Sequence, residues 1–337
     1  MNKPVRDNSR TAVVLFQLGG PDSLDAVEPF LHNLFSDPDI INFPFARLAR
    51  EPLARLMARH RAGKVRRHYA EIGGRSPLIE LTQAQAVALE AELAATLPAQ
   101  VLVAMRYWHP LTAEAVEAVR RGQFAQLVLL PLYPQYSRVT TGSSVNEWNR
   151  RFRVSGNHPP VTLVERFYDH PHYLDAVVGQ INRALGRFPA GARVHLLFSA
   201  HGIPESVIHA GDPYQRETEE TVRLVRERGA WPLLASLCYQ SKVGPGRWLG
   251  PMLNESLKAL RTAGTARVLV VPISFVTEHI ETLFEVDIEA RGLAAKLGFD
   301  QFEMMPALND SPVFIRALAD LVRRAVAQPV ETVSSVS

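Results

Sequence analysis

Eight short apolar runs, separated by longer amphipathic segments, constrain the fold more than any other feature of this 337-residue sequence. The runs contain many β-branched residues, so each predicts a buried strand. The intervening segments, such as 83–97 and 218–228, are long enough for helices that connect parallel strands. We therefore expect an α/β fold with parallel sheets that are covered on both faces. The predicted strands are 12–17, 101–105, 126–132, 161–164, 194–199, 233–237, 268–275 and 302–305.

The eight predicted strands fall into two sets of four, and the length of the chain fits two domains. We expect two Rossmann-like lobes, each a four-stranded parallel sheet flanked by helices. The N-terminal lobe would cover 10–172 and the C-terminal lobe 173–310, with a last helix over 311–328 that packs back on one of them. Ligands of such sheets bind outside the carboxyl ends of the strands, so the active site should lie in a cleft between the lobes.

The composition excludes several classes of protein. Hydrophobic residues make up 47% of the chain and charged residues 21%, which indicates filled cores and excludes disordered and fibrous classes. The richest apolar stretch, 266–276, is too short to span a bilayer, and the N-terminus has too small an apolar block for a secretory signal. We therefore expect a cytoplasmic protein. The single cysteine, Cys238, cannot ligate an iron–sulfur cluster by itself, and we expect it in the core.

Positive charge is concentrated in one segment. The net charge of +3 does not suggest a nucleic-acid-binding protein, but residues 47–67 hold eight Lys or Arg against Glu51, a local charge of +7. Pro52, which suits the first turn of a helix, and the apolar and arginine residues after it predict a short amphipathic helix within a basic lip of about 43–67. Three interpretations stay open: a plain surface helix, a contact with anionic lipid, or a lip that receives an apolar ligand bearing carboxylates.

Six loops that follow predicted strands carry aromatic, histidine, hydroxyl or carboxylate side chains. Their agreement indicates a ligand site along the strand ends. A tight turn explains the glycine pair of the first loop, and no dinucleotide or phosphate-binding motif is present. Residues 140–144 would either cap a helix or bind an anionic group, and both alternatives stay open. The loops are 18–21, 106–110, 133–144, 200–204, 239–245 and 277–281.

Among the histidines, His201 has the position most typical of a catalytic group. It comes at the end of a predicted strand and precedes Gly202, so little backbone bulk surrounds it. An imidazole there can accept a proton or bind a borderline metal ion near neutral pH. His109 and His195 lack that position, and we expect them to be structural, with His195 inside the strand itself.

A row of glutamates follows the seventh predicted strand. Glu278, Glu281, Glu285 and Glu289 would fall within roughly 80° of one another on an α-helix, at 100° per residue. Like charges at this spacing destabilise a helix unless solvent, protons or a cation relieve them. The row therefore predicts a path that passes a divalent ion inward or protons outward. Asp287, on the opposite face, is not explained by this pattern.

With these residues assembled, the sequence resembles the ferrochelatase family of class II chelatases over about residues 11–327. The most specific strings are Leu197-Phe198-Ser199-Ala200-His201-Gly202-Ile203-Pro204, Gln240-Ser241-Lys242-Val243-Gly244-Pro245 and His279-Ile280-Glu281-Thr282-Leu283. The resemblance implies a lyase that inserts Fe²⁺ into protoporphyrin IX with release of two protons, the last step of haem biosynthesis. It also implies the chelatase-like fold of two lobes with a cleft between them.

The resemblance also implies roles for individual residues. His201 and Glu281 would be the catalytic and metal-handling pair, facing each other across the porphyrin. The path for protons or metal would include Glu278, His279, Glu285 and Glu289. The porphyrin-binding residues would be Leu18, Arg61, Arg106, Tyr107, Tyr133, Ser241 and Trp248. A site made of imidazole and carboxylate groups binds iron loosely enough to pass it to four pyrrole nitrogens.

Two departures from the family pattern refine these expectations. Arg138 stands where some members have a cluster-binding cysteine, so we expect no iron–sulfur cluster and no other prosthetic group, with Fe²⁺ as a substrate. Leu18 stands where relatives that use coproporphyrin have tyrosine, which favours protoporphyrin. The alternatives are a related chelatase for cobalt or coproporphyrin and a non-catalytic porphyrin carrier. The expected partners are protoporphyrin IX, Fe²⁺ and the inner face of an anionic membrane, without nucleic acid; the sequence leaves the oligomeric state open.

Overall fold

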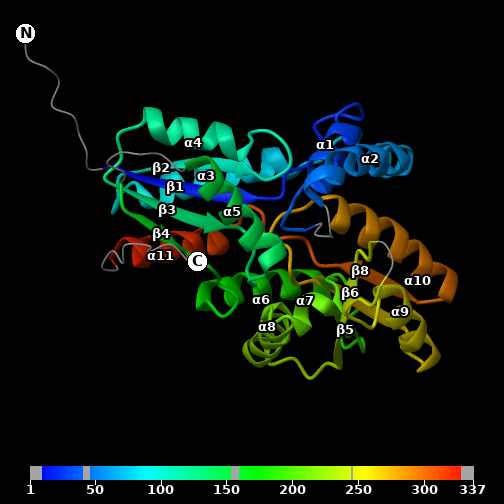
Figure 1. Ribbon diagram of the computed structural model, residues 1–337. Coiled ribbons are helices and arrows are strands. Elements are labelled where there is room, and N and C mark those ends of the chain that lie inside the picture. The colour runs from blue at the N-terminus through cyan, green and yellow to red at the C-terminus, as the bar shows by residue number, and fades with distance from the viewer. Residues whose placement is uncertain (1–9, 41–45, 153–158, 244–245, 328–337) are drawn as a thin grey trace, which may run out of the picture.

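The computed structural model describes residues 10–40, 46–152, 159–243 and 246–327, which form two four-stranded parallel sheets (Figure 1). The first sheet contains β1 (Thr11–Gln17), β2 (Ala99–Met105), β3 (Gln126–Pro131) and β4 (Val161–Leu163). The second contains β5 (His195–His201), β6 (Ala235–Gln240), β7 (Arg267–Pro272) and β8 (Gln301–Met304). The predicted α/β fold, with two four-stranded parallel sheets, is confirmed.

Helices cover both sheets. Those between β1 and β4 are α1 (Val27–Phe35), α2 (Ala46–Glu71), α3 (Leu78–Leu93), α4 (Thr112–Arg121), the π-helical turn η1 (Arg138–Gly142) and α5 (Ser143–Phe152). Those from β4 to β8 are α6 (Pro171–Leu185), α7 (Glu205–His209), α8 (Tyr214–Gly229), α9 (Leu253–Thr262), the π-helix η2 (Glu281–Ala290) and α10 (Arg291–Leu297). The last helix is α11 (Pro312–Ala327).

The two sheets share one strand order. The first strand of each set, β1 or β5, lies between the second and the third, and the fourth lies at an edge. Every residue of β1 is buried, and so are the five central residues of β5, as expected for strands covered on both faces. Because all pairs are parallel, the carboxyl ends of the strands in each sheet lie along one edge. The loops at these edges can therefore reach one cleft.

Alternation of side chains along β1 divides the core of the first lobe. Val14 and Phe16 face α4 and α5, where Phe16 makes an edge contact with Trp148 at 5.7 Å between ring centroids. Val13 and Leu15 lie on the other face and belong to a cluster that also holds Leu196 and Phe198 of β5. One hydrophobic core therefore runs through both lobes.

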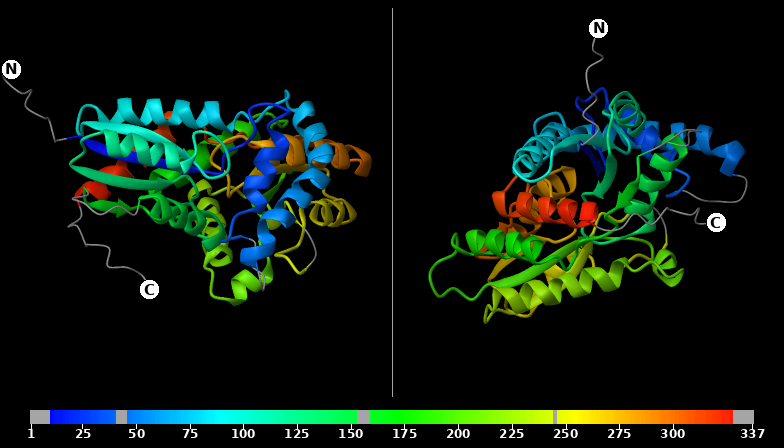
Figure 2. Two further views of the ribbon diagram at one scale, coloured as in Figure 1. Left: turned by 45° about the horizontal axis from the view of Figure 1, so that its top comes forward. Right: turned by 90° about the vertical axis from the view of Figure 1, so that its left-hand side faces the viewer.

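The helix α11 completes this shared core. It contacts α3 and α6 as well as β3 and β4, so it packs on the first sheet (Figure 2). Leu318 and Val322 of α11 are fully buried in the core. The sequence did not show which of the two lobes this helix would pack on. The boundary between lobes at residues 172 and 173 stays a prediction.

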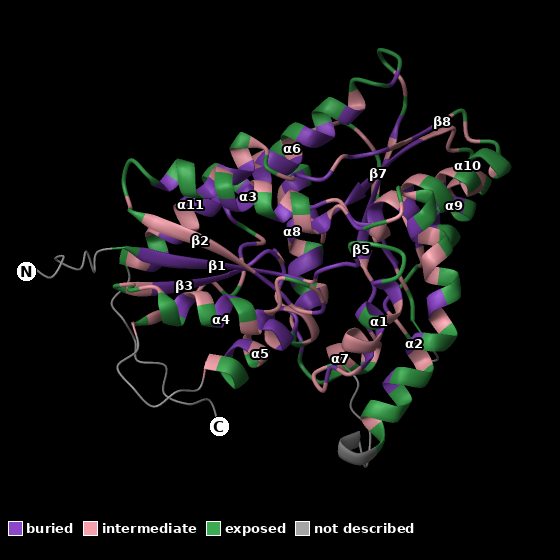
Figure 3. Cartoon of the chain, turned by 90° about the horizontal axis from the view of Figure 1, so that it is seen from above, coloured by how far each residue is buried: buried purple, intermediate pink, exposed green. Residues whose placement is uncertain are grey.

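Residues 46–67 of the basic lip form part of a longer helix than the pattern predicted, and residues 43–45 lie outside the described part of the chain. The helix α2 runs over 26 residues, and Pro52 lies inside it rather than in its first turn. Figure 3 shows α2 extending beyond the two sheets with much of its surface exposed. In the described part of the chain, no helix has the length and apolar character required to cross a bilayer.

Candidate active site

A cavity of about 100 Å³ lies where the strand ends of the two lobes meet. From the first lobe, Leu18 and Tyr133 line it. From the second lobe, His201, His279 and Glu281 line it. These five predicted site residues are spread over the sequence from position 18 to position 281. The predicted fold thus brings them into one cavity.

His201 is the last residue of β5, so the strand runs two residues further than predicted. Its Nδ1 lies 2.7 Å from Oε2 of Glu281. The next residue, Gly202, permits the turn that follows, because a Cβ atom there would lie 2.8 Å from the carbonyl oxygen of Gln240. His201 and Glu281, separated by 80 positions, therefore form a direct hydrogen-bonded pair.

This contact corrects the predicted arrangement of the pair. We expected His201 and Glu281 to face each other across a flat macrocycle. In this structure no ring can lie between them, because a hydrogen bond of 2.7 Å joins their side chains. The strand end of β5 and the start of η2 place both groups on the same side of the cavity, where they can act on one reacting atom together.

The electrostatics of the pair favour its charged form. Burial alone would lower the pKa of His201, but the Glu281 carboxylate outweighs burial and raises the pKa above its ordinary value. Burial would likewise raise the pKa of Glu281, but the His201 imidazole outweighs it and holds the pKa well below its ordinary value. At neutral pH the two groups therefore share a proton as an imidazolium and a carboxylate.

Ser241 joins this pair to a second carboxylate. Its Oγ lies 2.7 Å from Oε2 of Glu281 and 2.6 Å from Oε2 of Glu285. A hydroxyl has one proton, so it can donate to only one of them, and the other contact requires a proton on the carboxyl group. Burial and the neighbouring Glu281 raise the pKa of Glu285 to about 7, which supplies that proton. The four side chains form a continuous hydrogen-bonded chain from His201 to Glu285.

The backbone holds Ser241 in an uncommon conformation. Its φ angle is +64°, in the left-handed region that costs energy for residues other than glycine. Next to it, Gln240 accepts a hydrogen bond from Ser199 at 2.7 Å and donates one to the carbonyl oxygen of Glu281 at 2.8 Å. Two neighbouring strands thus fix both the serine hydroxyl and the start of η2. The strand β6 begins two residues later and ends three residues later than predicted, which brings Gln240 into the sheet.

The glutamate row lies on a π-helix, not on an α-helix. Glu281, Glu285 and Glu289 belong to η2, whose backbone bonds join residues five apart. Glu278 precedes the helix, so the predicted stack of four carboxylates is wrong at its first member. Burial decreases along the row, from the half-buried Glu281 and Glu285 to the exposed Glu289. Asp287 is explained by its ion pair of 2.5 Å with Arg291, one turn further along.

His279 is neutral and buried beside the pair. Its Nδ1 donates a hydrogen bond of 3.1 Å to the carbonyl oxygen of Thr277, and burial holds its pKa below the ordinary value. The other ring nitrogen therefore carries a lone pair. The ring of Phe275 contacts both imidazoles, with its centroid 4.6 Å from that of His279 and 6.3 Å from that of His201.

Two predicted porphyrin-binding residues, Arg106 and Tyr107, lie in a separate buried cluster around Asp37. Arg106 forms an ion pair of 2.8 Å with Asp37, and the Tyr107 hydroxyl donates to the same carboxylate at 2.6 Å. The hydroxyl of Ser143 also donates to this carboxylate, at 2.5 Å. A residue of the 140–144 segment thus binds an anionic group of the protein itself. Tyr107 is 1% exposed and does not line the cavity. The role of Tyr107 as a porphyrin-binding residue stays a prediction, and its burial away from the cavity does not support it.

Arg61 and Trp248 also lie outside the cavity lining. The Arg61 guanidinium packs over the ring of Phe35 at 5.8 Å, on the inner side of the lip. Trp248 is half-buried and pairs with Pro204 just beyond the turn that follows His201. His195 begins β5 and contacts Ser236, and the exposed His109 pairs with Glu114, so both lie away from the cavity lining.

Sequence reasoning missed Asp37 and Tyr69. Burial would raise the pKa of Asp37, but the ion pair with Arg106 outweighs it and lowers the pKa. Tyr69 of α2 is 2% exposed, and burial together with the nearby Glu281 raises its pKa. Asp37 is one of two aspartates in the loop after an apolar helix, and Tyr69 is one aromatic residue in a long basic helix. Neither position carries a pattern that marks a site.

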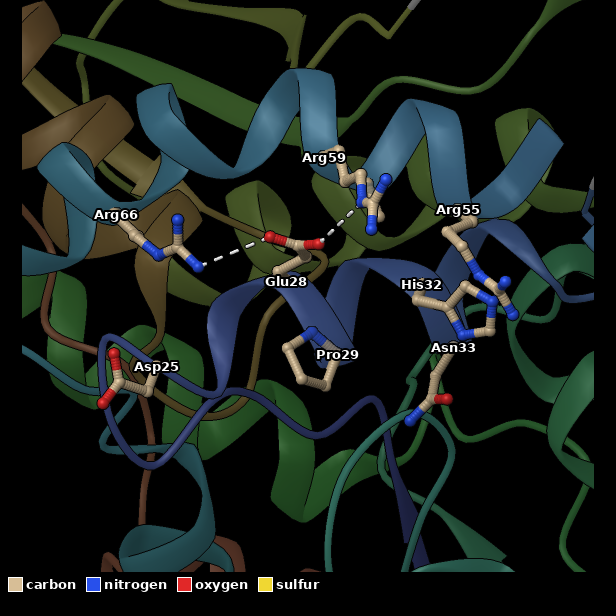
Figure 4. Close-up of a pocket in the computed structure, with 9 residues that line it drawn as sticks. Asp25, Glu28, Pro29, His32, Asn33, Arg55, Arg59 and Arg66 are labelled. Carbon is tan, nitrogen blue, oxygen red and sulfur yellow. Dashed lines mark ion pairs between the residues drawn. The ribbon is translucent and has the colours of Figure 1, made fainter. Parts of the chain in front are cut away.

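A larger cavity, of about 420 Å³, lies between α1 and α2 (Figure 4). Figure 4 shows Glu28 between Arg59 and Arg66, and it forms an ion pair of 3.6 Å with each. Arg55 and His32, which also line this cavity, both contact Glu51. Size alone would favour this cavity as the site. Its charged groups neutralise one another, however, and none of the predicted site residues lines it, so the chemistry favours the cavity between the lobes.

Comparison of structures identifies the fold. SirB from Bacillus subtilis with Fe³⁺ matches at a TM-score of 0.55 and 12% identity, over 95% of this chain and 96% of SirB. The sirohydrochlorin chelatase SirB from Bacillus subtilis subspecies spizizenii, in complex with cobalt, matches at 0.53 and 10% identity, over 95% and 97%. At such low identity this likeness shows the fold alone, which is the two-lobed fold of chelatases.

Comparison of sequences then gives the family. A profile described as Ferrochelatase matches residues 10–326. The ferrochelatase of Geobacter metallireducens is 52% identical over 319 residues, which cover 94% of this chain and 99% of the relative. That of Aquifex aeolicus is 45% identical, over 94% of this chain and 100% of the relative. The chain belongs to the ferrochelatase family, and the expected enzyme class, a lyase of haem biosynthesis that inserts Fe²⁺ into a porphyrin, is confirmed.

Proposed function

We propose that this chain inserts Fe²⁺ into protoporphyrin IX, with His201 and Glu281 as the groups that receive the metal ion and the pyrrole protons. The observation that carries the proposal is the hydrogen-bonded chain from His201 through Glu281 and Ser241 to Glu285, which begins in the cavity between the lobes. An imidazole and a carboxylate at 2.7 Å can hold a divalent ion together and can also hold a proton when the ion has left.

The reaction releases two protons for each ion inserted, so proton transfer must accompany metal transfer. When Fe²⁺ binds to the imidazole nitrogen and the carboxylate, the proton shared by His201 and Glu281 has to leave. Ser241 can accept it and pass its own proton to Glu285, whose pKa of about 7 lets it gain and lose a proton at neutral pH. Once the ion has passed to the porphyrin, the His201–Glu281 pair is free to accept a pyrrole proton. The same chain can then carry that proton outward.

The substrate requires the cavity to widen. At about 100 Å³ the cavity is smaller than the roughly 300–1,000 Å³ of pockets that hold small-molecule ligands, and a tetrapyrrole is a large ligand. The wall formed by the first lobe includes Leu18 and Leu78, which suit the apolar surface of a macrocycle. We infer that separation of this wall from the second lobe admits the ring edge beside His201. The apolar Leu18, in a position where relatives that use coproporphyrin have tyrosine, supports protoporphyrin IX as the substrate.

The visible spectrum of the porphyrin tests this function. Protoporphyrin IX is mixed with the protein, and Fe²⁺ is added without oxygen, with Zn²⁺ as a second ion. Insertion replaces the free-base bands by those of the metalloporphyrin. A porphyrin carrier would leave the free-base spectrum unchanged, and this result would contradict the proposal. Parallel assays with coproporphyrin and Co²⁺ test the two chelatase alternatives, either of which would be supported by a higher kcat/KM than that for protoporphyrin IX and Fe²⁺.

We propose further that no prosthetic group is bound. The single cysteine, Cys238, is fully buried in the core of the second lobe beside Leu197 and Leu257, and burial raises the pKa of its thiol to about 12. A thiol that is buried and stays protonated is a poor metal ligand. Iron therefore takes part as a substrate.

We also propose that the outer part of α2 contacts an anionic membrane surface on the cytoplasmic side. Leu56 and Leu53 are 65% and 38% exposed, although both are large apolar residues. Arg55 and Arg59, on the same turns, are also exposed. Exposed leucines beside arginines are typical of helices that lie in a lipid headgroup region. The porphyrin and its metal product have a large apolar ring, so this contact would shorten their transfer to the membrane.

A further inference from the structure

Glu278 has both carboxylate oxygens engaged by the protein. Oε1 accepts a hydrogen bond of 2.8 Å from the backbone N–H of Ala307, and Oε2 accepts one of 2.5 Å from the hydroxyl of Thr282. Its own backbone N–H donates to Oδ1 of Asn309 at 3.1 Å. Among the described residues, the lining of the cavity includes both neighbours of Glu278 in the sequence, Thr277 and His279, but not Glu278.

These bonds determine where η2 begins. Thr282 is fully buried, and its hydroxyl accepts a hydrogen bond of 3.1 Å from the N–H of His279. Glu278 and Thr282 therefore bracket the turn that contains His279 and leads into Glu281. A shift of this turn would move the Glu281 carboxylate relative to His201, since Glu281 lies one residue before Thr282.

The same turn is tied to the first lobe. Gln85 of α3 is fully buried and donates to the Thr277 hydroxyl at 3.1 Å and to the carbonyl oxygen of Asn309 at 2.9 Å. Asn309 has a φ angle of +44°, so its backbone is held in a strained conformation by these contacts. Three segments, from α3, the loop after β7 and the loop after β8, thus meet around Glu278.

We propose that Glu278 is a positioning residue and that its hydrogen-bond acceptors, not its charge, support metal insertion. It fixes the turn 278–282 so that Glu281 meets His201, and it carries neither the ion nor the protons. This replaces the expectation that Glu278 belongs to the acidic path. The inference rests on the proposed function of His201 and Glu281 as the reacting pair.

The variant Glu278→Gln separates the two roles. The amide oxygen of glutamine can still accept from Ala307, and its amide nitrogen can donate to the Thr282 hydroxyl. Thr282 then donates to the carbonyl oxygen of His279, which already lies 3.0 Å away. The positioning role predicts that kcat and its pH profile stay close to those of the wild type. In contrast, Glu278→Ala leaves the Ala307 N–H without its acceptor and removes the contact of Thr282 with residue 278, so it lowers kcat by about 10- to 100-fold, with little change in the KM for porphyrin.

Three comparisons decide the outcome. Thr282→Val, which keeps the side-chain shape, should lower kcat as Glu278→Ala does. The variant with both changes should lose no more kcat than the slower single variant. Glu281→Gln is the control for the reacting pair: activity retained in that variant would contradict the proposed function and not the role of Glu278. A loss in Glu278→Gln similar to that in Glu281→Gln would overturn the positioning role. Wild-type kcat in Glu278→Ala would overturn it as well, and if that variant does not fold, Glu278→Gln and Thr282→Val decide.

Discussion

The two lobes repeat one strand order, but their strand ends carry different chemistry. At the ends of β1 and β3 the first lobe presents Leu18 and Tyr133, and its charged residue, Arg106, is neutralised by the buried Asp37. At the ends of β5 and β7 the second lobe presents His201 and the groups linked to Glu281. The fold supplies two similar edges, but the histidine and carboxylate side chains that line the cavity all come from the second lobe. We infer that the first lobe shapes the cavity and the second performs proton and metal transfer.

The largest expected effect is the loss of activity in His201→Ala. Under the proposed function, removal of the imidazole deletes the group that accepts a proton and shares the ion, and such groups contribute about 10²- to 10⁴-fold to rates. The rate of metalloporphyrin formation should fall by that factor, while porphyrin binding, followed by protein fluorescence, should persist. The matched control is His109→Ala, because His109 is an exposed residue paired with Glu114. Equal rates of metalloporphyrin formation in the wild type and in His201→Ala would contradict a chemical role of the second lobe.

A smaller effect is expected from Glu285→Gln, and it should depend on pH. The pKa of Glu285 is raised to about 7, so the group is mainly protonated below that pH and mainly a carboxylate above it. Only the carboxylate can accept a proton from Ser241, so kcat of the wild type should rise as pH increases through about 7. Glutamine cannot accept that proton, and the variant should lose this rise and about tenfold of its rate above pH 7. An unchanged pH profile in the variant would exclude Glu285 from the proton path.

In the first lobe, Asp37→Asn should affect stability more than catalysis. Arg106 is 10% exposed at its side chain and Asp37 is 0% exposed, so loss of one partner leaves a buried charge unpaired, at a cost of about 3–5 kcal/mol. The urea midpoint of unfolding should fall, with no comparable loss of kcat in the folded fraction. The control Glu51→Gln breaks the exposed pair with Arg55 and should cost less than about 1 kcal/mol. A large loss of kcat with normal stability would show that the first lobe also takes part in the chemistry.

The smallest expected effect concerns the lip of the first lobe. Replacement of both Arg55 and Arg59 by Glu should weaken sedimentation with anionic vesicles, since a basic residue near such a surface contributes about 1 kcal/mol. Insertion into dissolved porphyrin should not change. The control variant replaces Arg216 and Lys258, which are exposed on α8 and α9, by Glu. If both double variants bind vesicles equally, the lip has no specific contact with lipid.

The sheets could be predicted from the sequence because buried parallel strands leave a local signal. Runs such as Val13 to Phe16 are apolar and β-branched whichever strands lie beside them, and all eight predicted runs are strands in the structure. The ends of strands were less certain, as β6 shows, because polar residues such as Gln240 enter the sheet only through bonds to a neighbouring strand.

The site could be predicted only in part. Residue types at strand ends placed His201 and Glu281 in one cleft, but their direct contact depends on the distance between β5 and η2, which no spacing along the chain encodes. The apolar pattern of 281–290 fits an α-helix as well as a π-helix, since the two differ in which backbone groups pair. For the same reason the sequence could not show that Glu278 stands outside the helix with its oxygens engaged.

A double-mutant comparison of insertion rates tests the central claim most directly. The rate of Fe²⁺ insertion is measured for the wild type, His201→Ala, Glu281→Gln and the variant with both changes. If the two side chains act as one unit, the double variant should be about as slow as the slower single variant. Losses that multiply would show that imidazole and carboxylate act independently, and this result would contradict the account.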